Sequence, residues 1–298
     1  MTPLGSFTTR LGSTFLLVST LACFLLGGCA GKPAAQGTAP LVFGLLPTES
    51  STNAERRWTP LLSHLEAKTG RPVKALKVVD YAALVEALRF GKADLAYLGP
   101  KAYVLARERA GVEPLAQEVP LEGQPSYHGL IVAKADSAAS SVDDLKGGTF
   151  AFVDPNSTSG YLVPLVHFIE DRKVEPAAFF SEVRYAGSHQ AVLLQVRLGH
   201  VDAGATNDLD LARAIQGGDI KANELKTLWT SDPIPGSPIV ARKGMDEALL
   251  NTLRSALVDY DDADGLARMQ SRGFIAVTDA TYEPVRRLER VKDSRSDP

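Results

Sequence analysis

Short apolar runs alternate with longer segments whose apolar residues recur at helical spacing. Trp58, Leu61 and Leu65, for example, fall on one face of a predicted helix that Gly70 ends. The apolar runs of this first block, each followed by such a helix, are residues 41–46, 73–78 and 93–98. Strands that alternate with helices at this spacing predict an α/β fold built from βαβ units, with a mostly parallel sheet.

A second block repeats this pattern. Its predicted strands are residues 129–133, 149–153, 183–185, 201–206 and 225–229. Residues 120–126 separate the two blocks, and the turn-rich residues 231–238 lead back to a strand at 239–242. The end of the chain is predicted to be helical, most strongly over residues 245–260. We therefore predict two lobes, one of residues 41–124 with 240–290 and one of residues 125–239.

The N-terminal residues have the pattern of a signal peptide. Residues 1–28 contain one charged residue, Arg10, and an apolar run over residues 15–26. That run is shorter than the roughly 20 apolar residues that a membrane-spanning helix needs. It ends in Leu26-Gly27-Gly28-Cys29, which resembles a bacterial lipobox.

Cys29 is therefore predicted to be lipidated and to become the first mature residue. Residues 29–40, mostly small and polar, would form a flexible tether. The chain is then expected beyond the inner membrane, on its periplasmic or cell-surface side, held by its lipid alone. Cys23 leaves with the leader, so no free thiol is expected for a disulfide, a metal or a nucleophile.

The composition and net charge of the chain exclude some classes of function. The chain has 298 residues, 45% of them hydrophobic, and removal of residues 1–28 changes its formal net charge from −3 to −4. Such a length can bury a large core. Such a charge gives no general attraction to nucleic acid, so any anion must be held by local hydrogen-bond donors. Histidine, cysteine and carboxylate residues show no metal-ligand spacing, and we expect neither a metal nor another cofactor.

Three consecutive hydroxyl residues stand where a predicted strand passes into a predicted helix. Ser157, Thr158 and Ser159 follow the turn at Asp154 and precede Gly160 and an apolar helix start. The first N–H groups of a helix lack intrahelical partners and the helix dipole is positive there, so this position suits a tetrahedral oxyanion. Glycine would let a ligand approach the backbone closely. The alternative is that one hydroxyl simply caps the helix, which requires no ligand.

Several separated segments resemble, in the right order, the phosphonate-, phosphite- and phosphate-binding lipoproteins of ABC importers. The first-lobe segments are Asp80-Tyr81-Ala82-Ala83-Leu84-Val85-Glu86-Ala87-Leu88-Arg89-Phe90-Gly91 and Ala93-Asp94-Leu95-Ala96-Tyr97-Leu98-Gly99-Pro100. The others are Asp154-Pro155-Asn156-Ser157-Thr158-Ser159-Gly160 and Ile234-Pro235-Gly236-Ser237-Pro238-Ile239-Val240. The resemblance covers roughly residues 41–275.

This resemblance implies a type II periplasmic-binding-protein fold, in which two lobes joined by two crossover strands close on a ligand. It implies a monomer that delivers a small phosphorus oxyanion to a membrane permease and its ATPase. The ligand-binding residues predicted on this basis are Ser157, Thr158, Ser159, Tyr81, Tyr127, His189, Asp210 and Ser237. Further candidates in the first strand-end loop are Glu49, Ser50 and Ser51.

The sequence departs from the members of that family that bind aminoalkylphosphonates. Those members hold the ligand's ammonium with carboxylates near Asp210 and at the position of Ser237. Asp210 can supply one carboxylate, whereas Ser237 cannot supply the other. Burying an ammonium beside one carboxylate is costly, so phosphite, phosphate or methylphosphonate is the expected ligand.

Three other kinds of function remain open from the residues alone. A phosphatase or phosphoryl transferase would need a nucleophile with a base, and His189 is the sole evident partner for the serines, so we expect no enzyme. A ligand-sensing lipoprotein would present the same cleft to a signalling partner. A structural or adhesive lipoprotein would bind no small ligand.

Overall fold

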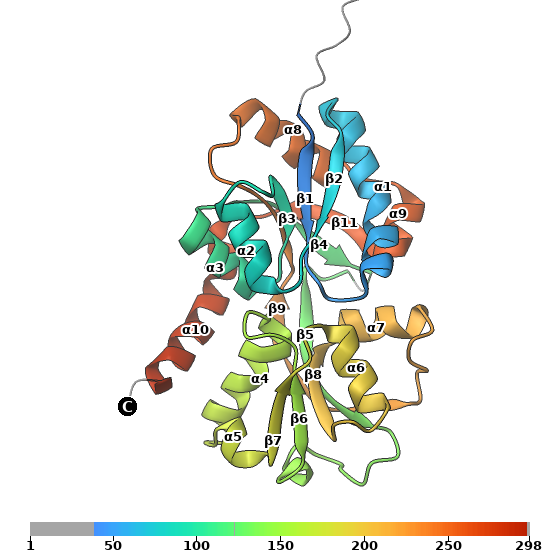
Figure 1. Cartoon of the computed structure of the whole chain (residues 1–298), viewed down its shortest axis with the longest axis vertical. Helices are drawn as coiled ribbons and strands as arrows, with labels where there is room; N and C mark the ends of the chain where they lie inside the picture. Colours follow the sequence, from blue (N-terminus) through green and yellow to red (C-terminus); the bar gives the residue numbers. More distant parts are fainter. Residues whose placement is uncertain (1–38, 122, 297–298) are drawn as a thin grey trace, which may run out of the picture. The chain divides into compact units, whose positions relative to one another are not determined.

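The computed structural model describes residues 39–121 and 123–296, all within one compact unit. The predicted signal peptide, Cys29 and most of the predicted tether lie outside the described residues. The described residues form one sheet of six strands and one of five, which we call the sheets of the first and the second lobe (Figure 1).

The first lobe has the strand order β11-β4-β10-β3-β1-β2. Its strands are β1 (Leu41–Leu45), β2 (Val73–Lys77), β3 (Leu95–Tyr97), β4 (Glu113–Pro120), β10 (Pro238–Ala241) and β11 (Ser271–Ala276). Its helices are α1 (Ser51–Thr69), α2 (Tyr81–Arg89), α3 (Pro100–Ala110), α8 (Glu247–Val258) and α9 (Ala263–Met269). Trp58 of α1 packs between Phe43 and Tyr97 of the sheet, with ring centroids 5.5 and 4.7 Å away.

The second lobe has the strand order β7-β6-β8-β5-β9. Its strands are β5 (Ser126–Lys134), β6 (Thr149–Phe152), β7 (Glu182–Tyr185), β8 (Ala203–Asn207) and β9 (Leu225–Pro235). Its helices are α4 (Val163–Val166), α5 (Pro176–Phe179), α6 (His189–Arg197) and α7 (Asp208–Gln216). A cluster of phenylalanines around Phe150 and Phe168 fills its core.

The expectation of mostly parallel sheets is wrong. In the first lobe β1 is parallel to β2 and β3, but β10 is antiparallel to β3 and β4, and β11 is antiparallel to β4. In the second lobe β5 is antiparallel to β8 and β9. The βαβ units are parallel, as predicted. β4, β5, β9 and β10 carry the chain between the lobes, and of these β5 and β10 run in the opposite sense to the βαβ strands of their sheets, as does β11.

Two segments differ from their predicted structure. Residues 231–235 belong to β9 instead of a turn, and β9 tolerates Pro233 and Pro235 because it is an edge strand that pairs with β5 alone. The end of the chain is not wholly helical, because β11 pairs with β4. Both segments lack the alternation from which a strand is recognised, so pairing with a neighbour decides their structure.

The two crossovers between the lobes lie side by side. One joins β4 to β5 and the other joins β9 to β10 through Gly236 and Ser237. Gly236 N–H donates to Pro125 O at 3.0 Å, and Glu118 N–H donates to Ser237 O at 3.1 Å. A Cβ at Gly236 would lie 2.7 Å from Glu118 O, so a glycine is required for this close approach.

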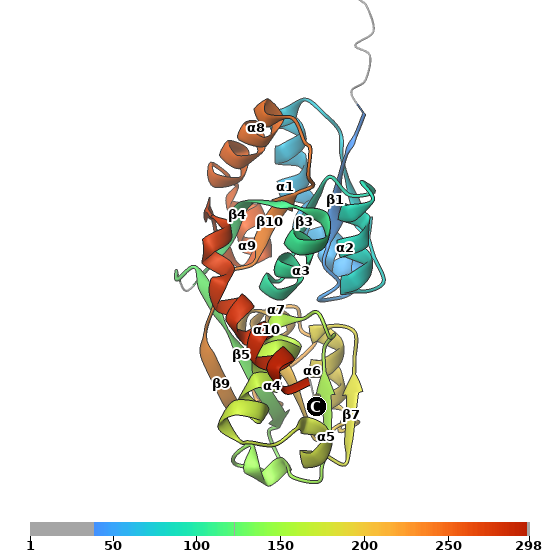
Figure 2. The ribbon, with the colours of Figure 1, turned by 90° about the vertical axis from the view of Figure 1, so that its left-hand side faces the viewer.

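The C-terminal helix, α10 (Glu283–Ser296), contacts both lobes. It packs against α3 of the first lobe and against α4 of the second, as Figure 2 shows. Lys101 of α3 is largely buried and forms an ion pair with Glu289 of α10 at 2.5 Å. Its ammonium also lies over the Tyr161 ring, 5.5 Å from the centroid.

Candidate functional site

A cavity of about 30 Å³ lies between the lobes, where the loops after several strands meet. The first lobe and the crossover contribute Leu46, Thr48, Tyr81, Tyr97, Gly99 and Ser237, and the second lobe contributes Tyr127, Ser157, Thr158, Ser159, His189, Asn207, Leu209, Asp210 and Arg213. A single water needs about 10–15 Å³ of such space, so the cavity suits a ligand of few heavy atoms. All eight residues predicted to bind ligand line it.

Ser157 begins the helical segment that follows β6. Its Oγ accepts a hydrogen bond from Gly160 N–H at 3.0 Å, so it caps this segment as the simpler interpretation proposed. The first turn is wide, because Leu162 N–H donates five residues back, to Ser157 O at 3.1 Å. The triplet therefore stands at a helix N-terminus, as predicted.

Thr158 and Ser159 make different contacts. Thr158 Oγ1 accepts from Lys101 N–H of α3, in the opposite lobe, at 2.8 Å. Ser159 Oγ accepts from Asn207 Nδ2 at 3.2 Å. In these contacts, as in the cap made by Ser157, the hydroxyl is the acceptor, so its own O–H is left to donate elsewhere. The triplet thus presents three O–H donors beside a helix N-terminus.

Gly160 has a different role from the one expected. A Cβ at this position would lie 2.3 Å from Cγ2 of Val153, at the end of the preceding strand. Glycine therefore lets the first turn pack onto β6, and its close approach is to the protein rather than to a ligand.

Two buried hydroxyls that line the cavity have no hydrogen-bond partner within the described residues. They are Oγ1 of Thr48, in the loop after β1, and Oη of Tyr81, at the start of α2; the side-chain hydroxyl nearest to the latter is that of Ser157, which shares the cavity wall. Tyr81 is 1% exposed, and its burial raises the pKa of its phenol, which keeps the hydroxyl protonated. Buried polar groups are nearly always paired, so these two indicate that a ligand or water completes the site.

His189 is the first residue of α6 and lies almost fully buried beside the triplet. Its Nδ1 is 3.1 Å from Oγ1 of Thr206. Burial lowers the pKa of His189 from its ordinary value of 6.5, so the ring is neutral at neutral pH. A neutral imidazole contributes a directed donor or acceptor without a fixed charge.

This burial predicts an acid sensitivity of folding. The unfolded chain protonates His189 near pH 6.5 and the folded protein only at lower pH, so stability is full above pH 6.5 and decreases as pH falls toward the lowered pKa. The loss is about 1.4 kcal/mol for each unit of pKa depression. Urea unfolding at pH 7.5 and pH 5 should show a smaller loss in His189→Gln than in the wild type. Equal losses would contradict the prediction.

Asp210 lies in the first turn of α7, next to its capping residue Asn207. Asn207 Oδ1 accepts from Asp210 N–H at 2.7 Å, and Asn207 Nδ2 donates to Asp210 Oδ2 at 2.8 Å. Burial opposes ionisation of Asp210, but the positive charges of His189 in its protonated form and of the Arg213 guanidinium outweigh it and lower the pKa of this carboxyl. Asp210 is therefore a carboxylate at neutral pH.

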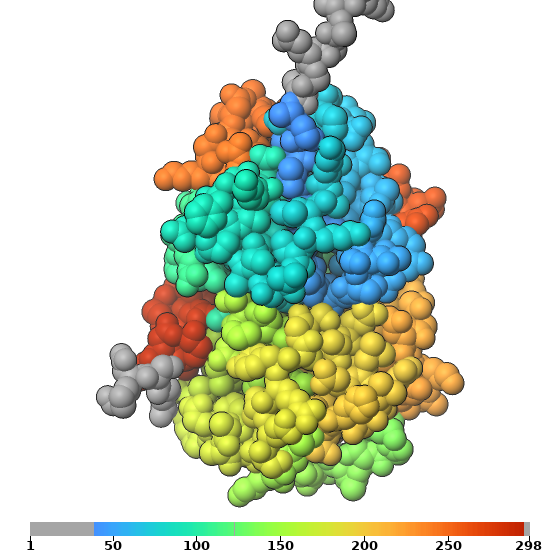
Figure 3. All heavy atoms as spheres, viewed as in Figure 1, coloured from blue at the N-terminus to red at the C-terminus, as the bar shows by residue number. Residues whose placement is uncertain are grey.

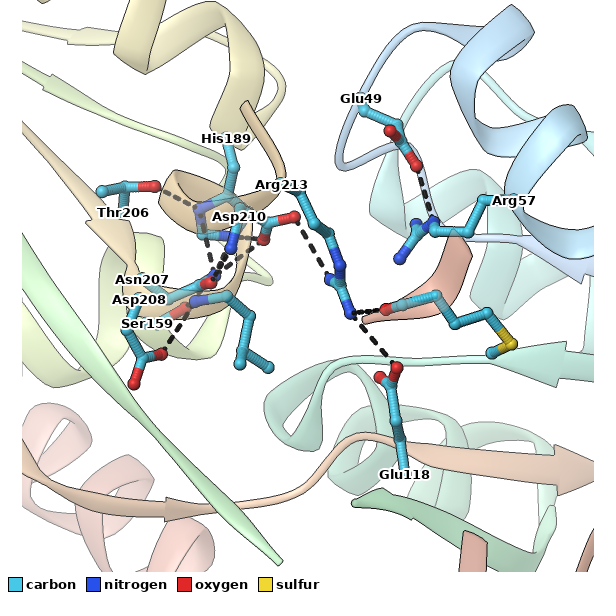
Figure 4. Close-up of polar contacts among 12 residues, drawn as sticks. Glu49, Arg57, Glu118, Ser159, His189, Thr206, Asn207, Asp208, Asp210 and Arg213 are labelled. Atoms are coloured by element: carbon cyan, nitrogen blue, oxygen red, sulfur yellow. Dashed lines mark hydrogen bonds and ion pairs between the residues drawn. The ribbon is translucent and has the colours of Figure 1, made fainter. Parts of the chain in front are cut away.

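Arg213 joins this carboxylate to the first lobe, as Figure 4 shows. Its Nη1 is 3.5 Å from Asp210 Oδ1, and its Nη2 is 3.1 Å from Glu118 Oε1 of β4. Nη2 also donates to Met269 O at 3.2 Å. Tyr97 Oη donates to the other oxygen of Glu118 at 2.5 Å. One guanidinium thus bridges two buried carboxylates from opposite lobes.

The lobes are in contact on the side of Thr48 and His189 as well. Gln190 N–H of α6 donates to Thr48 O at 3.1 Å, and Ser50 N–H donates to Gln190 Oε1 at 2.6 Å. The space-filling view shows atoms of the two lobes meeting along this face (Figure 3). The structure therefore has the lobes closed around the cavity.

Three candidates lie outside the cavity wall, and several residues that line it were not predicted. Glu49, Ser50 and Ser51 do not line this cavity: Glu49 pairs with Arg57 at 2.8 Å, and Ser50 caps α1. Lining residues that were not predicted are Leu46, Thr48, Tyr97, Gly99, Asn207, Leu209 and Arg213. Asn207 could have been found as an N-cap after a buried strand, and Arg213 from its position three residues after Asp210.

Two further observations concern residues 39–121 and 123–296. Within them, no group of three or more histidine, cysteine or acidic residues is placed to hold a metal ion. None of their helices combines the length and the apolar character needed to cross a membrane.

Two α/β lobes joined by two adjacent crossovers, closed on a small polar cavity, define the class of periplasmic binding proteins. A sequence model of the family "ABC transporter, phosphonate, periplasmic substrate-binding protein" matches residues 43–282. The chain belongs to this family.

Individual proteins of this family are similar to the chain over most of its length. The chain is 33% identical to the phosphonates-binding periplasmic protein of Escherichia coli K12 (85% of this chain, 77% of that protein). It is 31% identical to the phosphate-import protein PhnD of Mycolicibacterium smegmatis (91% and 94%). A solved structure from Pseudomonas aeruginosa, a binding protein component of an ABC phosphonate transporter, is 36% identical with a TM-score of 0.80 (84% and 85%). The predicted fold and family are confirmed.

Proposed function

We propose that this substrate-binding component captures phosphite, phosphate or methylphosphonate between its lobes and delivers it to the importer's permease and ATPase. Family membership makes the chain a periplasmic substrate-binding component of an ABC importer. The E. coli relative is named for phosphonates and the M. smegmatis relative for phosphate import, which supports a phosphorus oxyanion as the ligand.

The unpartnered hydroxyls of Thr48 and Tyr81 are the observation that carries this proposal. Together with the O–H groups of the triplet they converge on one small cavity from both lobes. Donors without full positive charge suit an oxyanion in a site from which water is excluded, because charge-assisted hydrogen bonds are strong there. The ligand-binding residues proposed are Ser157, Thr158, Ser159, Tyr81, Tyr127, His189, Asp210 and Ser237, with Thr48 added.

The cavity also supports a small ligand. Its volume of about 30 Å³ favours ligands with a small substituent on phosphorus over ligands with a longer one. Leu46 and Leu209 in its wall offer apolar contact to a hydrogen or a methyl group. Ser237 lines the cavity with a hydroxyl where a carboxylate would be needed to hold an ammonium.

Calorimetric titration of the mature protein tests the proposal. Phosphite, phosphate and methylphosphonate are expected to bind, with 2-aminoethylphosphonate and sulfate much weaker. Tighter binding of 2-aminoethylphosphonate than of phosphite would overturn the ligand preference. No binding by any phosphorus compound would overturn the function itself.

We also propose how the protein is anchored, where its lobes begin and end, and that it has no catalytic activity. The sequence is the basis for five proposals: removal of residues 1–28, lipidation at Cys29, a tether to residue 40, lobe limits near residues 124 and 239, and a monomeric state. It is also the basis for the absence of catalysis, which long incubation with phosphonates and phosphomonoesters would test. A signalling partner in place of a permease would use the same cavity, and finding a permease gene and an ATPase gene beside this one would favour transport.

A further inference from the structure

The electrostatic surroundings of Asp210 bear on which ligands the cavity accepts. Asp210 is the one carboxylate among the described residues that line the cavity. A carboxylate there would attract the ammonium of a zwitterionic phosphonate if its charge were free. Its charge is not free, because Arg213 lies beside it in the same wall, one turn further along α7.

We propose that Arg213 is a specificity-determining residue: its guanidinium supplies the positive charge that Asp210 would otherwise take from a ligand, and so disfavours ligands that carry an ammonium. The inference rests on the proposed function and names the charge class that this site rejects. An ammonium next to Asp210 would lie close to a guanidinium that is 3.5 Å from the same carboxylate. Like charges at such separations repel, and a low local dielectric strengthens the repulsion.

Glu118 holds the guanidinium in this position when the lobes are closed. It approaches Arg213 to 3.1 Å from β4, in the opposite lobe, while Tyr97 Oη donates to its other oxygen. The contact of Arg213 with Met269 O adds a second anchor in the first lobe. Opening the lobes separates Arg213 from these groups, whereas its pairing with Asp210 lies within α7. Arg213 therefore contributes to closure as well as to charge selection, and the two roles need separate tests.

Charge selection is tested with two ligands of equal size. 2-Aminoethylphosphonate and n-propylphosphonate have the same chain length and differ by the ammonium, so the ratio of their dissociation constants reports charge apart from volume. Arg213→Gln is expected to shift this ratio at least tenfold toward 2-aminoethylphosphonate, as measured by calorimetry or by competition with methylphosphonate. Arg213→Lys retains the charge and should keep the wild-type ratio.

Two further variants separate charge selection from closure. Glu118→Gln weakens the contact between lobes and leaves the charge of Arg213 beside Asp210 less compensated. Both ligands should therefore bind more weakly, and their ratio should not shift toward 2-aminoethylphosphonate. Adding Asp210→Asn to Arg213→Gln removes the carboxylate and should return the ratio toward the wild-type value, because Arg213 acts through Asp210.

A failure of the inference about Arg213 gives a different result from a failure of the proposed function. If methylphosphonate binds and the ratio is the same in Arg213→Gln as in the wild type, the inference is wrong and the proposed function stands. If Glu118→Gln shifts the ratio toward 2-aminoethylphosphonate as far as Arg213→Gln does, closure rather than charge selects the ligand, and the inference is again wrong. If the wild type binds no phosphorus compound, the proposed function fails and the inference with it.

Discussion

Ser159→Asp is expected to abolish capture of the ligand. The new carboxylate would stand in the cavity wall within a few ångströms of the bound oxyanion. Two unit charges about 4 Å apart repel by about 4 kcal/mol at an effective dielectric constant of 20, and a dianion is repelled more strongly. Affinity should therefore fall at least about a thousandfold, as measured by calorimetry with methylphosphonate and phosphite.

Two control variants make the result specific. Ser159→Ala removes the hydroxyl without adding charge, and a loss of about tenfold is expected from one missing hydrogen bond. Thr227→Asp places the same charge on the exposed face of β9 in the same lobe and should leave affinity unchanged. Thermal unfolding without ligand verifies that Ser159→Asp still folds. A folded Ser159→Asp protein with near wild-type affinity would place the anion elsewhere.

Tyr81→Phe is expected to weaken binding and, at the same time, to favour closure of the empty protein. Hydrogen bonds to charged groups contribute about 1.5–3 kcal/mol, so affinity should fall roughly 10- to 100-fold. Without ligand, closing the lobes buries a Tyr81 hydroxyl that has no protein partner, which costs about 1–3 kcal/mol. Phenylalanine removes this cost, so small-angle scattering should show a smaller radius of gyration for the empty variant than for the empty wild type.

Tyr260→Phe is the matched control. Tyr260 is buried at 3% exposure in the first lobe, and its hydroxyl likewise lacks a partner within the described residues, but it does not line the cavity. Its replacement should change neither affinity nor the dimensions of the empty protein. Weaker binding by Tyr81→Phe with unchanged scattering would mean that water satisfies the hydroxyl when the empty lobes close.

The parts of the site that the sequence predicts are those in which local structure fixes position. Ser157 follows the buried strand β6 and begins a helix, and Tyr81 and His189 begin the helices after the edge strands β2 and β7. In βαβ units such positions gather at the carboxyl edge of a sheet, so separate motifs converge on one cavity once two sheets face each other. Ser157, Tyr81 and His189 line the same cavity for this reason, whereas Tyr127 and Ser237 reach it from the crossovers between the lobes.

The parts that the sequence does not predict depend on contacts between distant segments. Arg213 and Glu118 are 95 residues apart and meet because the lobes close. That the hydroxyls of Thr48 and Tyr81 lack a hydrogen-bond partner can likewise be seen only in the folded structure. Residues 231–235 of β9 and all of β11 are strands because they pair with distant segments, and no local pattern predicts them.

The helix that spans both lobes makes the C-terminal region a natural place for an optical reporter. Because α10 packs on α3 and on α4, separating the lobes must remove it from one of them, and its surroundings change with ligand occupancy. The sequence from residue 39 onward contains no cysteine, so Arg287→Cys on the exposed face of α10 would offer one thiol for an environment-sensitive dye. A fluorescent sensor for small phosphorus compounds could be built on this geometry.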